Sequence, residues 1–199
     1  IPYGSGLSSS ASIELVTAVA LASLCGDATV FQPKNLIQMA LAGQRAENHF
    51  CGVNCGIMDQ FASAMGKANH AILLNCGTLE YKYVPLDLGD HVLILANTCK
   101  KHSLGASKYN ERRGEVDMGL KILQNVCPKD TQNLCDYTEA EFEQYKDAIS
   151  DPVIRNRVQH VIFENERVKK AVTVLEAGDL QAFGKIMCDA NASIRDLYE

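Results

Sequence analysis

Glycines and serines crowd the start of the chain in a pattern that could bind an anion. Residues 2–11 read Pro-Tyr-Gly-Ser-Gly-Leu-Ser-Ser-Ser-Ala and lead directly into an apolar run. Glycines let a backbone approach a ligand closely, and the free N–H groups at a helix start favour negative charge. Serine hydroxyls can bind phosphate or Mg²⁺. The segment predicts a phosphate-binding loop, and a glycine-serine turn capped by a serine is the structural alternative.

An aspartate further along the chain could act as a general base. Asp59 falls near the start of a predicted short helix, where its carboxylate could orient a hydroxyl group and accept its proton during phosphoryl transfer. An aspartate at this position also interacts favourably with the helix dipole without any chemical role. Taken alone, the position favours this second interpretation. The histidines at 49, 70, 91 and 160 form no triad that the sequence can show.

Apolar residues at helical spacing predict the helices that must position these groups. One helix follows the loop and ends at Gly26. A second begins at Pro33 and ends at Gly52, and a short third ends at Gly66. This layout predicts that Asp59 lies in the first turn of the third helix.

Short apolar and alternating runs predict strands in the middle of the chain, at residues 71–74, 79–84 and 91–96. The first two resemble a hairpin joined through Gly77. From Ser103 onward the pattern is helical, with boundaries at Cys127–Pro128, Thr138–Glu141, Asp151–Pro152 and Gly178–Asp179. The chain therefore predicts an α+β fold with a mixed N-terminal region and a helical C-terminal third.

Composition excludes several classes of protein. The chain has 199 residues, 47% of them hydrophobic, and a formal net charge of −5, which is typical of one globular domain and excludes fibrous and disordered classes. The negative charge gives no general attraction to nucleic acid or to anionic membranes. No apolar run approaches the roughly 18 residues that span a bilayer. We therefore expect neither nucleic acid nor membrane as a partner.

The chain has eight cysteines and no C-x-x-C pair, which favours buried free thiols in a reducing cytoplasm over disulfides. We therefore expect a cytoplasmic location. Cys51 and Cys55, with His49 nearby, could suggest zinc, but a second ligand pair is not evident.

The combined motifs are more specific than any one of them. Residues 2–11 resemble the second motif of the GHMP small-molecule kinases, P-x-x-x-G-L-S-S-S-A. Residues 55–61, Cys-Gly-Ile-Met-Asp-Gln-Phe, are similar to the segment of galactokinases that carries the catalytic aspartate. Segments 97–113 and 155–167 are also similar to galactokinases. The resemblance covers nearly the whole chain.

The resemblance implies a fold and an activity. The fold would be a ribosomal protein S5 domain 2-like unit at residues 1–100, followed at residues 101–199 by the helical part of a ferredoxin-like C-terminal GHMP kinase domain. The activity would be transfer of a phosphoryl group from MgATP to the C1 hydroxyl of α-D-galactose, giving galactose 1-phosphate.

The resemblance also implies roles for individual residues. Asp59 would be the general base, and Gly56 and Tyr109 would contact the sugar together with it. Mg²⁺ would be held by Glu47 and Ser10, since Mg²⁺ needs few protein ligands beside phosphate oxygens; Ser9 is the close alternative to Ser10. ATP would bind the loop residues Gly4, Ser5, Gly6, Leu7, Ser8, Ser9, Ser10 and Ala11. Apart from the resemblance, Gly56 could be a plain helix-start residue, Tyr109 a core tyrosine and Glu47 a solvated helix residue.

Two other functions are also compatible with the sequence. They are another GHMP sugar kinase, such as an N-acetylgalactosamine kinase, and a non-catalytic sensor of galactose and ATP.

Two galactokinase motifs, an upstream sugar-binding segment and a downstream glycine-rich segment, do not occur in the chain. We therefore expect an internal fragment that is inactive by itself and that can form a homodimer through exposed sheet edges.

Overall fold

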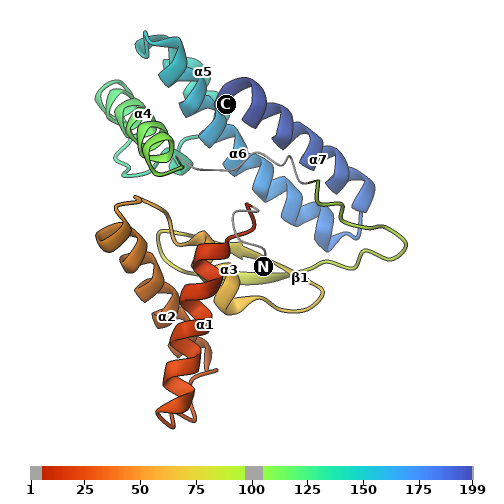
Figure 1. Cartoon of the computed structure of the whole chain (residues 1–199). Coiled ribbons are helices and arrows are strands. Elements are labelled where there is room, and N and C mark those ends of the chain that lie inside the picture. The colour runs from red at the N-terminus through yellow and green to blue at the C-terminus, as the bar shows by residue number, and fades with distance from the viewer. Residues whose placement is uncertain (1–5, 97–104, 199) are drawn as a thin grey trace. The chain divides into compact units, whose positions relative to one another are not determined.

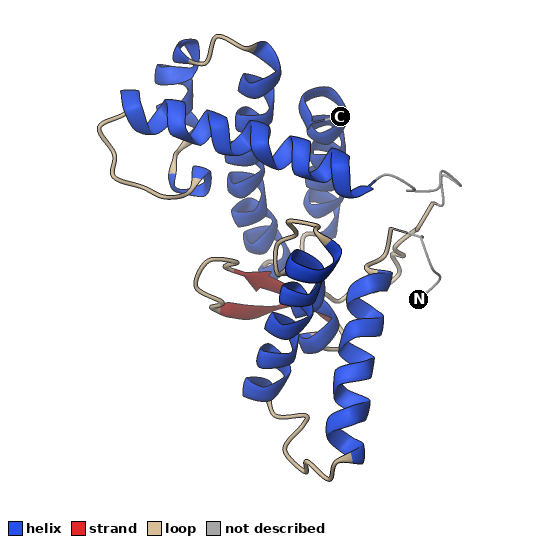
Figure 2. Cartoon of the chain, turned by 60° about the vertical axis from the view of Figure 1, so that its left-hand side comes forward, coloured by secondary structure: helices blue, strands red, loops and turns tan. Residues whose placement is uncertain are grey.

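The structure of the chain, a computed structural model, describes residues 6–96 and 105–198, and at 105–107 the backbone alone. The chain divides into two compact units, Ile1–Tyr109 and Asn110–Glu199, referred to as the first and second units. The helices and strands are traced along the chain in Figure 1. Strands occur in the first unit, and helices make up the regular structure described in the second (Figure 2). The predicted α+β class is therefore confirmed.

The helices of the first unit begin and end close to the predicted residues. They are α1 (Ser9–Leu24), α2 (Pro33–Ala46) with its π-helical continuation η1 (Glu47–Cys51), and α3 (Met58–Met65). Pro33 stands at the first helical position of α2, where its missing N–H has no consequence. After α1 and η1, Gly26 and Gly52 have φ angles of 81° and 72°, a left-handed conformation that glycine adopts without steric cost.

The predicted hairpin is also present. Strands β1 (His70–Leu74) and β2 (Tyr81–Pro85) pair antiparallel. In the turn between them the side chain of Asn75 accepts hydrogen bonds from the backbone N–H groups of Gly77 and Thr78, at 2.9 and 3.1 Å. An asparagine that bonds to the backbone ahead of it is a common way of stabilising such a turn.

The predicted strand at residues 91–96 is wrong. These residues have no regular secondary structure and all are exposed; Val92 and Ile94 are 77% and 84% exposed. An apolar run can satisfy strand periodicity, but a strand also needs a neighbour whose backbone groups complete its hydrogen bonds. Within the described residues no strand pairs with this segment.

The core of the first unit joins α2, α3 and the hairpin. Ala40 of α2 and Ile57, Phe61 and Met65 at α3 are almost completely buried together. The ring of Phe61 meets that of Tyr81 edge to face, with centroids 5.3 Å apart. Helix α3 is therefore anchored by one apolar face, which fixes the direction of its remaining side chains.

The second unit is a set of helices around its own core. These are α4 (Gly105–Val126, entering the unit at residue 110), η2 (Leu134–Asp136), α5 (Glu139–Tyr145), η3 (Lys146–Ala148), α6 (Pro152–Glu176), α7 (Leu180–Ser193) and η4 (Ile194–Tyr198). Phe142, Ile149, Val158 and Ile162 are fully buried in the core. In Figure 1, α6 and α7 lie side by side.

Side-chain caps fix the helix starts in the second unit as predicted. Thr138 and Glu141 form the capping box of α5, in which each side chain bonds to the backbone N–H of the other residue. Asp151 caps α6 and Asp179 caps α7. No helix in residues 6–96 or 105–198 is long and apolar enough to cross a membrane.

The cysteines described by the structure are free thiols, but their expected burial is wrong for most of them. Cys127 is buried and Cys55 partly so, whereas Cys25, Cys51, Cys76, Cys135 and Cys188 are exposed. Most of the exposed thiols stand at the ends of elements or in turns, where apolar neighbours in the sequence do not imply an inward direction.

Alanine substitutions at two glycines can test how closely the helices of the second unit pack. A Cβ atom at Gly119 of α4 would overlap Cγ2 of Val158 in α6, whereas at Gly184 of α7 it would meet no described atom within 4 Å. We expect Gly119→Ala to lower the free energy of unfolding by about 1–3 kcal/mol through overpacking. Gly184→Ala should raise it by about 0.5–1 kcal/mol through helix propensity. Urea unfolding followed by circular dichroism measures both; equal effects would contradict the close contact of α4 and α6.

Candidate active site

The described part of the predicted phosphate loop is a bend at Gly6 and Leu7 that runs into α1. Gly6 has a φ angle of 72°, and Ser8, the N-cap residue, has φ 57° and ψ 42°. A non-glycine residue in this left-handed conformation costs on the order of 1 kcal/mol, and such residues are frequent at ligand-binding sites. Among the described residues, the Ser8 side chain makes no capping hydrogen bond to α1. The predicted loop residues Gly4 and Ser5 lie outside the described residues.

The first turn of α1 directs its side chains in different directions. Ala11 is completely buried and anchors the helix, whereas Ser10 is exposed and Ser9 is half-buried. Leu7, at the turn itself, is 40% exposed. The loop therefore presents a serine hydroxyl to solvent at the N-terminus of a helix, a position that suits an anion or a metal ion bound to one.

Asp59 lies in the first turn of α3, as predicted, and is exposed. Its neighbours fix it in that direction, because Ile57 and Phe61 are buried in the core and Gln60 is 2% exposed. Gly56 precedes the helix and is exposed. Helix α3 thus turns an amide inward and a carboxylate outward at consecutive positions.

The other predicted site residues belong to two further elements. Glu47 is the first residue of η1 and is half-buried. Because α1 and α2 pack against one another, the N-terminal helix and the element that carries Glu47 belong to one packed group. Tyr109 lies on α4 and is 44% exposed, so it is partly buried, which agrees both with the predicted sugar contact and with the alternative of a partly buried core tyrosine.

Sequence reasoning missed a glutamate that contacts this group. Glu14 of α1 accepts a hydrogen bond from Nε2 of Gln60, at 3.3 Å, and the Glu47 carboxylate acts on it electrostatically. Burial raises the pKa of Glu14, and the Glu47 carboxylate raises it further, while the Gln60 bond acts in the opposite direction. Its position four residues after Ser10, on the same side of the helix, is the signal that could have revealed it.

Cys55 fixes the segment between η1 and α3. Its thiol donates to Oδ1 of Asn48 at 3.3 Å, and its carbonyl accepts from Nε2 of Gln44 at 3.3 Å. Burial raises the pKa of the Cys55 thiol, and the nearby carboxylates of Glu47 and Glu14 raise it further. The thiol is therefore a hydrogen-bond donor at neutral pH rather than a nucleophile.

Few side chains in the described residues lie together where they could serve as ligands of a metal ion. Within the described ranges, no group of three or more His, Cys, Asp or Glu side chains could hold a metal. A magnesium ion that also binds phosphate oxygens and water needs few protein ligands, and the carboxylate of the half-buried Glu47 and the hydroxyl of the exposed Ser10 are oxygen donors of the kind that it takes.

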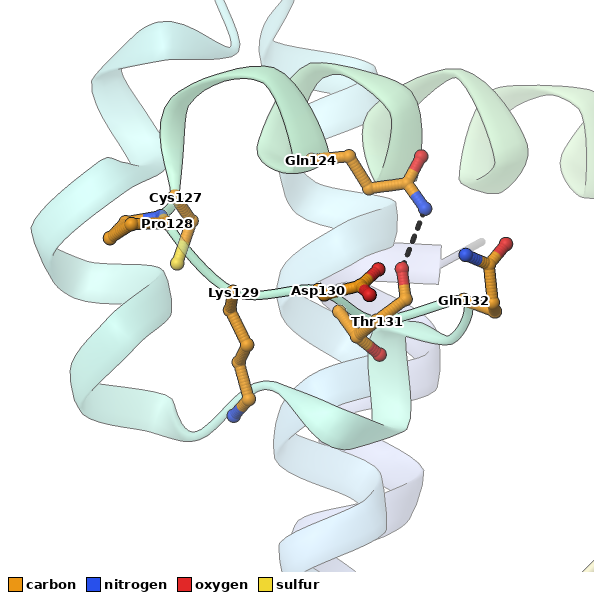
Figure 3. Close-up of a pocket in the computed structure, with 7 residues that line it drawn as sticks. All are labelled: Gln124, Cys127, Pro128, Lys129, Asp130, Thr131 and Gln132. Carbon is orange, nitrogen blue, oxygen red and sulfur yellow. Dashed lines mark hydrogen bonds between the residues drawn. The ribbon is translucent and has the colours of Figure 1, made fainter.

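A pocket in the second unit is not part of this arrangement. It measures about 610 Å³ and is lined by Gln124 and by the loop of residues 127–132, as Figure 3 shows. Gln124 spans the loop by donating to the carbonyl of Thr131 at 2.7 Å. None of the predicted site residues lines this pocket.

A histidine and a serine also meet in the second unit, but in a buried setting. Nδ1 of His160 lies 2.9 Å from Oγ of Ser193, and both residues are 8% exposed. The ring of Tyr198 covers the imidazole, with centroids 4.8 Å apart. A nucleophile must reach its substrate, so this pair is structural.

The N-terminal helices of the first unit match a known protein family. Residues 1–67 match the GHMP kinases N terminal domain, a range that contains the loop, Glu47 and Asp59. The family resemblance inferred from the motifs at residues 2–11 and 55–61 is thereby confirmed for residues 1–67, about a third of the chain.

Individual proteins similar to this chain are galactokinases. The galactokinase of Clostridium acetobutylicum is 50% identical over 200 residues, and that of Clostridium tetani is 48% identical over 199 residues; each match covers 100% of this chain and 49% of the relative. A crystal structure of Lactococcus lactis galactokinase complexed with galactose superimposes with a TM-score of 0.90 at 41% identity, covering 100% of this chain and 50% of that one. The chain is homologous to galactokinases along its whole length, and it spans about half the length of these relatives.

The buried imidazole predicts how stability depends on pH. Burial lowers the pKa of His160, and Arg167 and Arg157 lower it further against the opposing effect of Glu164. Below the ordinary histidine pKa of about 6.5, the unfolded chain therefore binds a proton that the folded chain does not. The free energy of unfolding consequently decreases as the pH is lowered. Between about pH 7.5 and 5.5 the unchanged chain should lose more stability in urea than His160→Gln. Parallel losses in the two proteins would contradict a depressed pKa.

Proposed function

We propose that this chain carries the catalytic half of a galactokinase, which transfers a phosphoryl group from ATP to the C1 hydroxyl of α-D-galactose and yields galactose 1-phosphate. The observation that carries the proposal is the match over the entire chain to galactokinases, at 48% and 50% identity and with a TM-score of 0.90 to one whose structure holds galactose.

In this proposal Asp59 is the general base. Phosphoryl transfer to a hydroxyl needs a carboxylate that orients the nucleophile and accepts its proton. The exposed position of Asp59, on a helix whose opposite face is buried, supports this role because the carboxylate is accessible and its backbone is fixed. Gly56 and Tyr109, both exposed, are the further residues that we propose to contact the sugar.

The loop at residues 4–11 is proposed to bind ATP. The unusual conformation of Ser8 and the N-terminus of α1 support phosphate binding at its described part. Ser10 and Glu47 would hold Mg²⁺, with Ser9 as the alternative hydroxyl. The ion, when bound, neutralises charge on the phosphates. The residues of this chain orient the nucleotide and the sugar hydroxyl around it.

The proposal also includes the domain boundaries of the chain and its cellular location. We assign residues 1–100 to an N-terminal GHMP kinase domain of the ribosomal protein S5 domain 2-like kind and residues 101–199 to the helical part of the C-terminal domain. The free thiols are compatible with a reducing compartment, and the cytoplasmic location stays a prediction.

The rival functions differ from this one in testable ways. An N-acetylgalactosamine kinase would prefer the acetamido sugar, whereas the matched relatives named above are galactokinases. A sensor would bind galactose and ATP without turnover. Asp59, retained and exposed, favours the enzyme over the sensor.

The direct test uses a hybrid protein in which this chain replaces the matching half of Lactococcus lactis galactokinase. Release of ADP is measured with galactose, with N-acetylgalactosamine and without sugar. We expect galactose-dependent turnover, and we expect Asp59→Asn to lower kcat at least about 100-fold because the base is lost. The matched control is Asp90→Asn, another exposed aspartate of the first unit, which should leave kcat within about twofold.

Three results would oppose the proposal. Preference for N-acetylgalactosamine would favour the rival kinase. Binding of both ligands without ADP release would favour the sensor. Equal activity of Asp59→Asn and Asp90→Asn would remove the role assigned to Asp59.

Self-association is a separate proposal with its own test. The apolar side chains of residues 92–95 are 62–84% exposed, and such an exposed apolar segment can associate with a second copy of the chain. Light scattering of the chain at rising concentration should approach the mass of a homodimer, and Ile94→Lys should weaken it by adding charge to the exposed segment. A strict monomer at all concentrations would contradict the proposal.

A further inference from the structure

A charged side chain lies in the interior of the second unit. Arg157 of α6 is only 4% exposed, although a guanidinium group keeps its charge inside a protein. Burial of a charge costs free energy unless an opposite charge and hydrogen-bond acceptors surround it. The groups around Arg157 must therefore compensate its charge.

Two elements distant in the chain supply these groups. Nε of Arg157 donates to Oε2 of Glu115 in α4 at 3.1 Å, and the Glu115 side chain is itself only 20% exposed. Nη1 of Arg157 donates to the carbonyl of Leu197 in η4 at 2.8 Å. The guanidinium carbon lies over the ring of Tyr198, 5.5 Å from its centroid. Arg157 thus connects α4, α6 and η4 at one buried point.

The ion pair with Glu115 holds the N-terminal part of α4. Apolar contacts hold the later part of that helix, because Leu123 and Cys127 belong to the buried core and Val116 packs against it. Glu115 precedes these residues. A buried ion pair adds little net stability compared with apolar residues, but an arrangement that separates its members leaves a buried charge without a partner. The pair therefore favours one rotation of α4 against α6.

Glu115 is close along the helix to a residue that we propose to contact the sugar. Tyr109 lies six residues before it in α4, which is less than two helical turns, or about 9 Å along the axis. Because both residues belong to one continuous helix, a rotation of the backbone at Glu115 turns Tyr109 with it. The ion pair is therefore placed to control the direction of the Tyr109 side chain.

We propose that Arg157 is a positioning residue for sugar binding: by holding Glu115, it keeps the start of α4 in the rotation that presents Tyr109 to galactose. The inference rests on the proposed function for the role of Tyr109. Arg157 acts through Glu115 and touches no substrate. A misplaced Tyr109 weakens binding of the ground state and of the transition state alike, which raises the KM for galactose and leaves kcat unchanged.

Substitutions at Glu115 break the pair and leave the contacts of Arg157 with η4 in place. Glu115→Met has a similar length but no charge and only a weak acceptor, whereas Glu115→Gln keeps an acceptor oxygen for Nε of Arg157. Asp117→Leu is the matched control. It removes another ion pair of α4, that of Asp117 with Arg113, whose side chains are 48% and 59% exposed.

The first measurement is steady-state kinetics of the hybrid protein used to test the proposed function. Glu115→Met should raise the KM for galactose about fivefold and leave kcat and the KM for ATP within about twofold. Glu115→Gln and Asp117→Leu should stay within about twofold of the unchanged hybrid in all three constants. An unchanged KM for galactose in Glu115→Met, or an equal change in the KM for ATP, would overturn the inference.

A double-mutant cycle tests whether the effect passes through Tyr109. Tyr109→Ala should itself raise the KM for galactose, and Glu115→Met should raise it no further in that background, because the residue that the pair positions is gone. A merely structural role of the pair does not depend on Tyr109. Equal factors for Glu115→Met in the two backgrounds would therefore overturn the inference.

Hydrogen exchange separates this inference from the proposed function. The backbone N–H groups of residues 110–116 should exchange faster in Glu115→Met than in Asp117→Leu, because the start of α4 has lost its contact with α6. Equal exchange rates in the two variants would overturn the inference.

Two further outcomes are decisive as well. If the unchanged hybrid neither binds nor phosphorylates galactose, the proposed function fails and the role in sugar binding fails with it, while hydrogen exchange still decides whether the ion pair holds α4. If Glu115→Met does not fold, Glu115→Asp keeps the charge and shortens the side chain by one methylene. That variant should raise the KM for galactose selectively, and an unchanged KM would overturn the inference.

Discussion

Helices α1, α2 and α3 can approach one another closely because Gly43 has no side chain at the point where they meet. Each helix ends or begins at a group with a proposed role: the loop at the start of α1, Glu47 after α2, and Asp59 in the first turn of α3. Any change that separates the helices would move these groups relative to one another. A protein interior transmits such strain because it is closely packed.

Neighbouring polar residues of the first unit differ in burial and therefore in what they can bind. Gln60 and Glu14 lie within the helix contact and bond to each other, whereas Asp59, adjacent to Gln60 in sequence, is exposed. The apolar residues Phe61 and Ile57 hold α3 in this rotation. A carboxylate that must accept a proton from a substrate has to be accessible, but its backbone has to be rigid, and an anchored first turn meets both needs.

Local signals in the sequence predicted most of the elements correctly. Pro33, the left-handed glycines after helices and the Thr138 capping box depend on nearby residues alone, so their effects can be read without the fold. The segment at 91–96 failed because a strand depends on a partner elsewhere, which periodicity does not reveal.

Some residues of the candidate site could likewise be identified from local sequence motifs, and others could not. Asp59 and the loop before α1 belong to recognisable motifs and were identified from the sequence. Glu14 was not, because its hydrogen bond joins it to Gln60, a residue 46 positions away in the chain that only the packing of the helices brings close. The buried pairing of His160 with Ser193 was invisible for the same reason.

The central claim is that Asp59 activates a sugar hydroxyl, and its most direct test is a crystal structure of the hybrid protein with galactose and a non-hydrolysable ATP analogue. We expect the Asp59 carboxylate to lie within hydrogen-bond reach, about 2.6–3.2 Å, of the C1 hydroxyl. Galactose bound elsewhere, or bound with another hydroxyl toward Asp59, would contradict it.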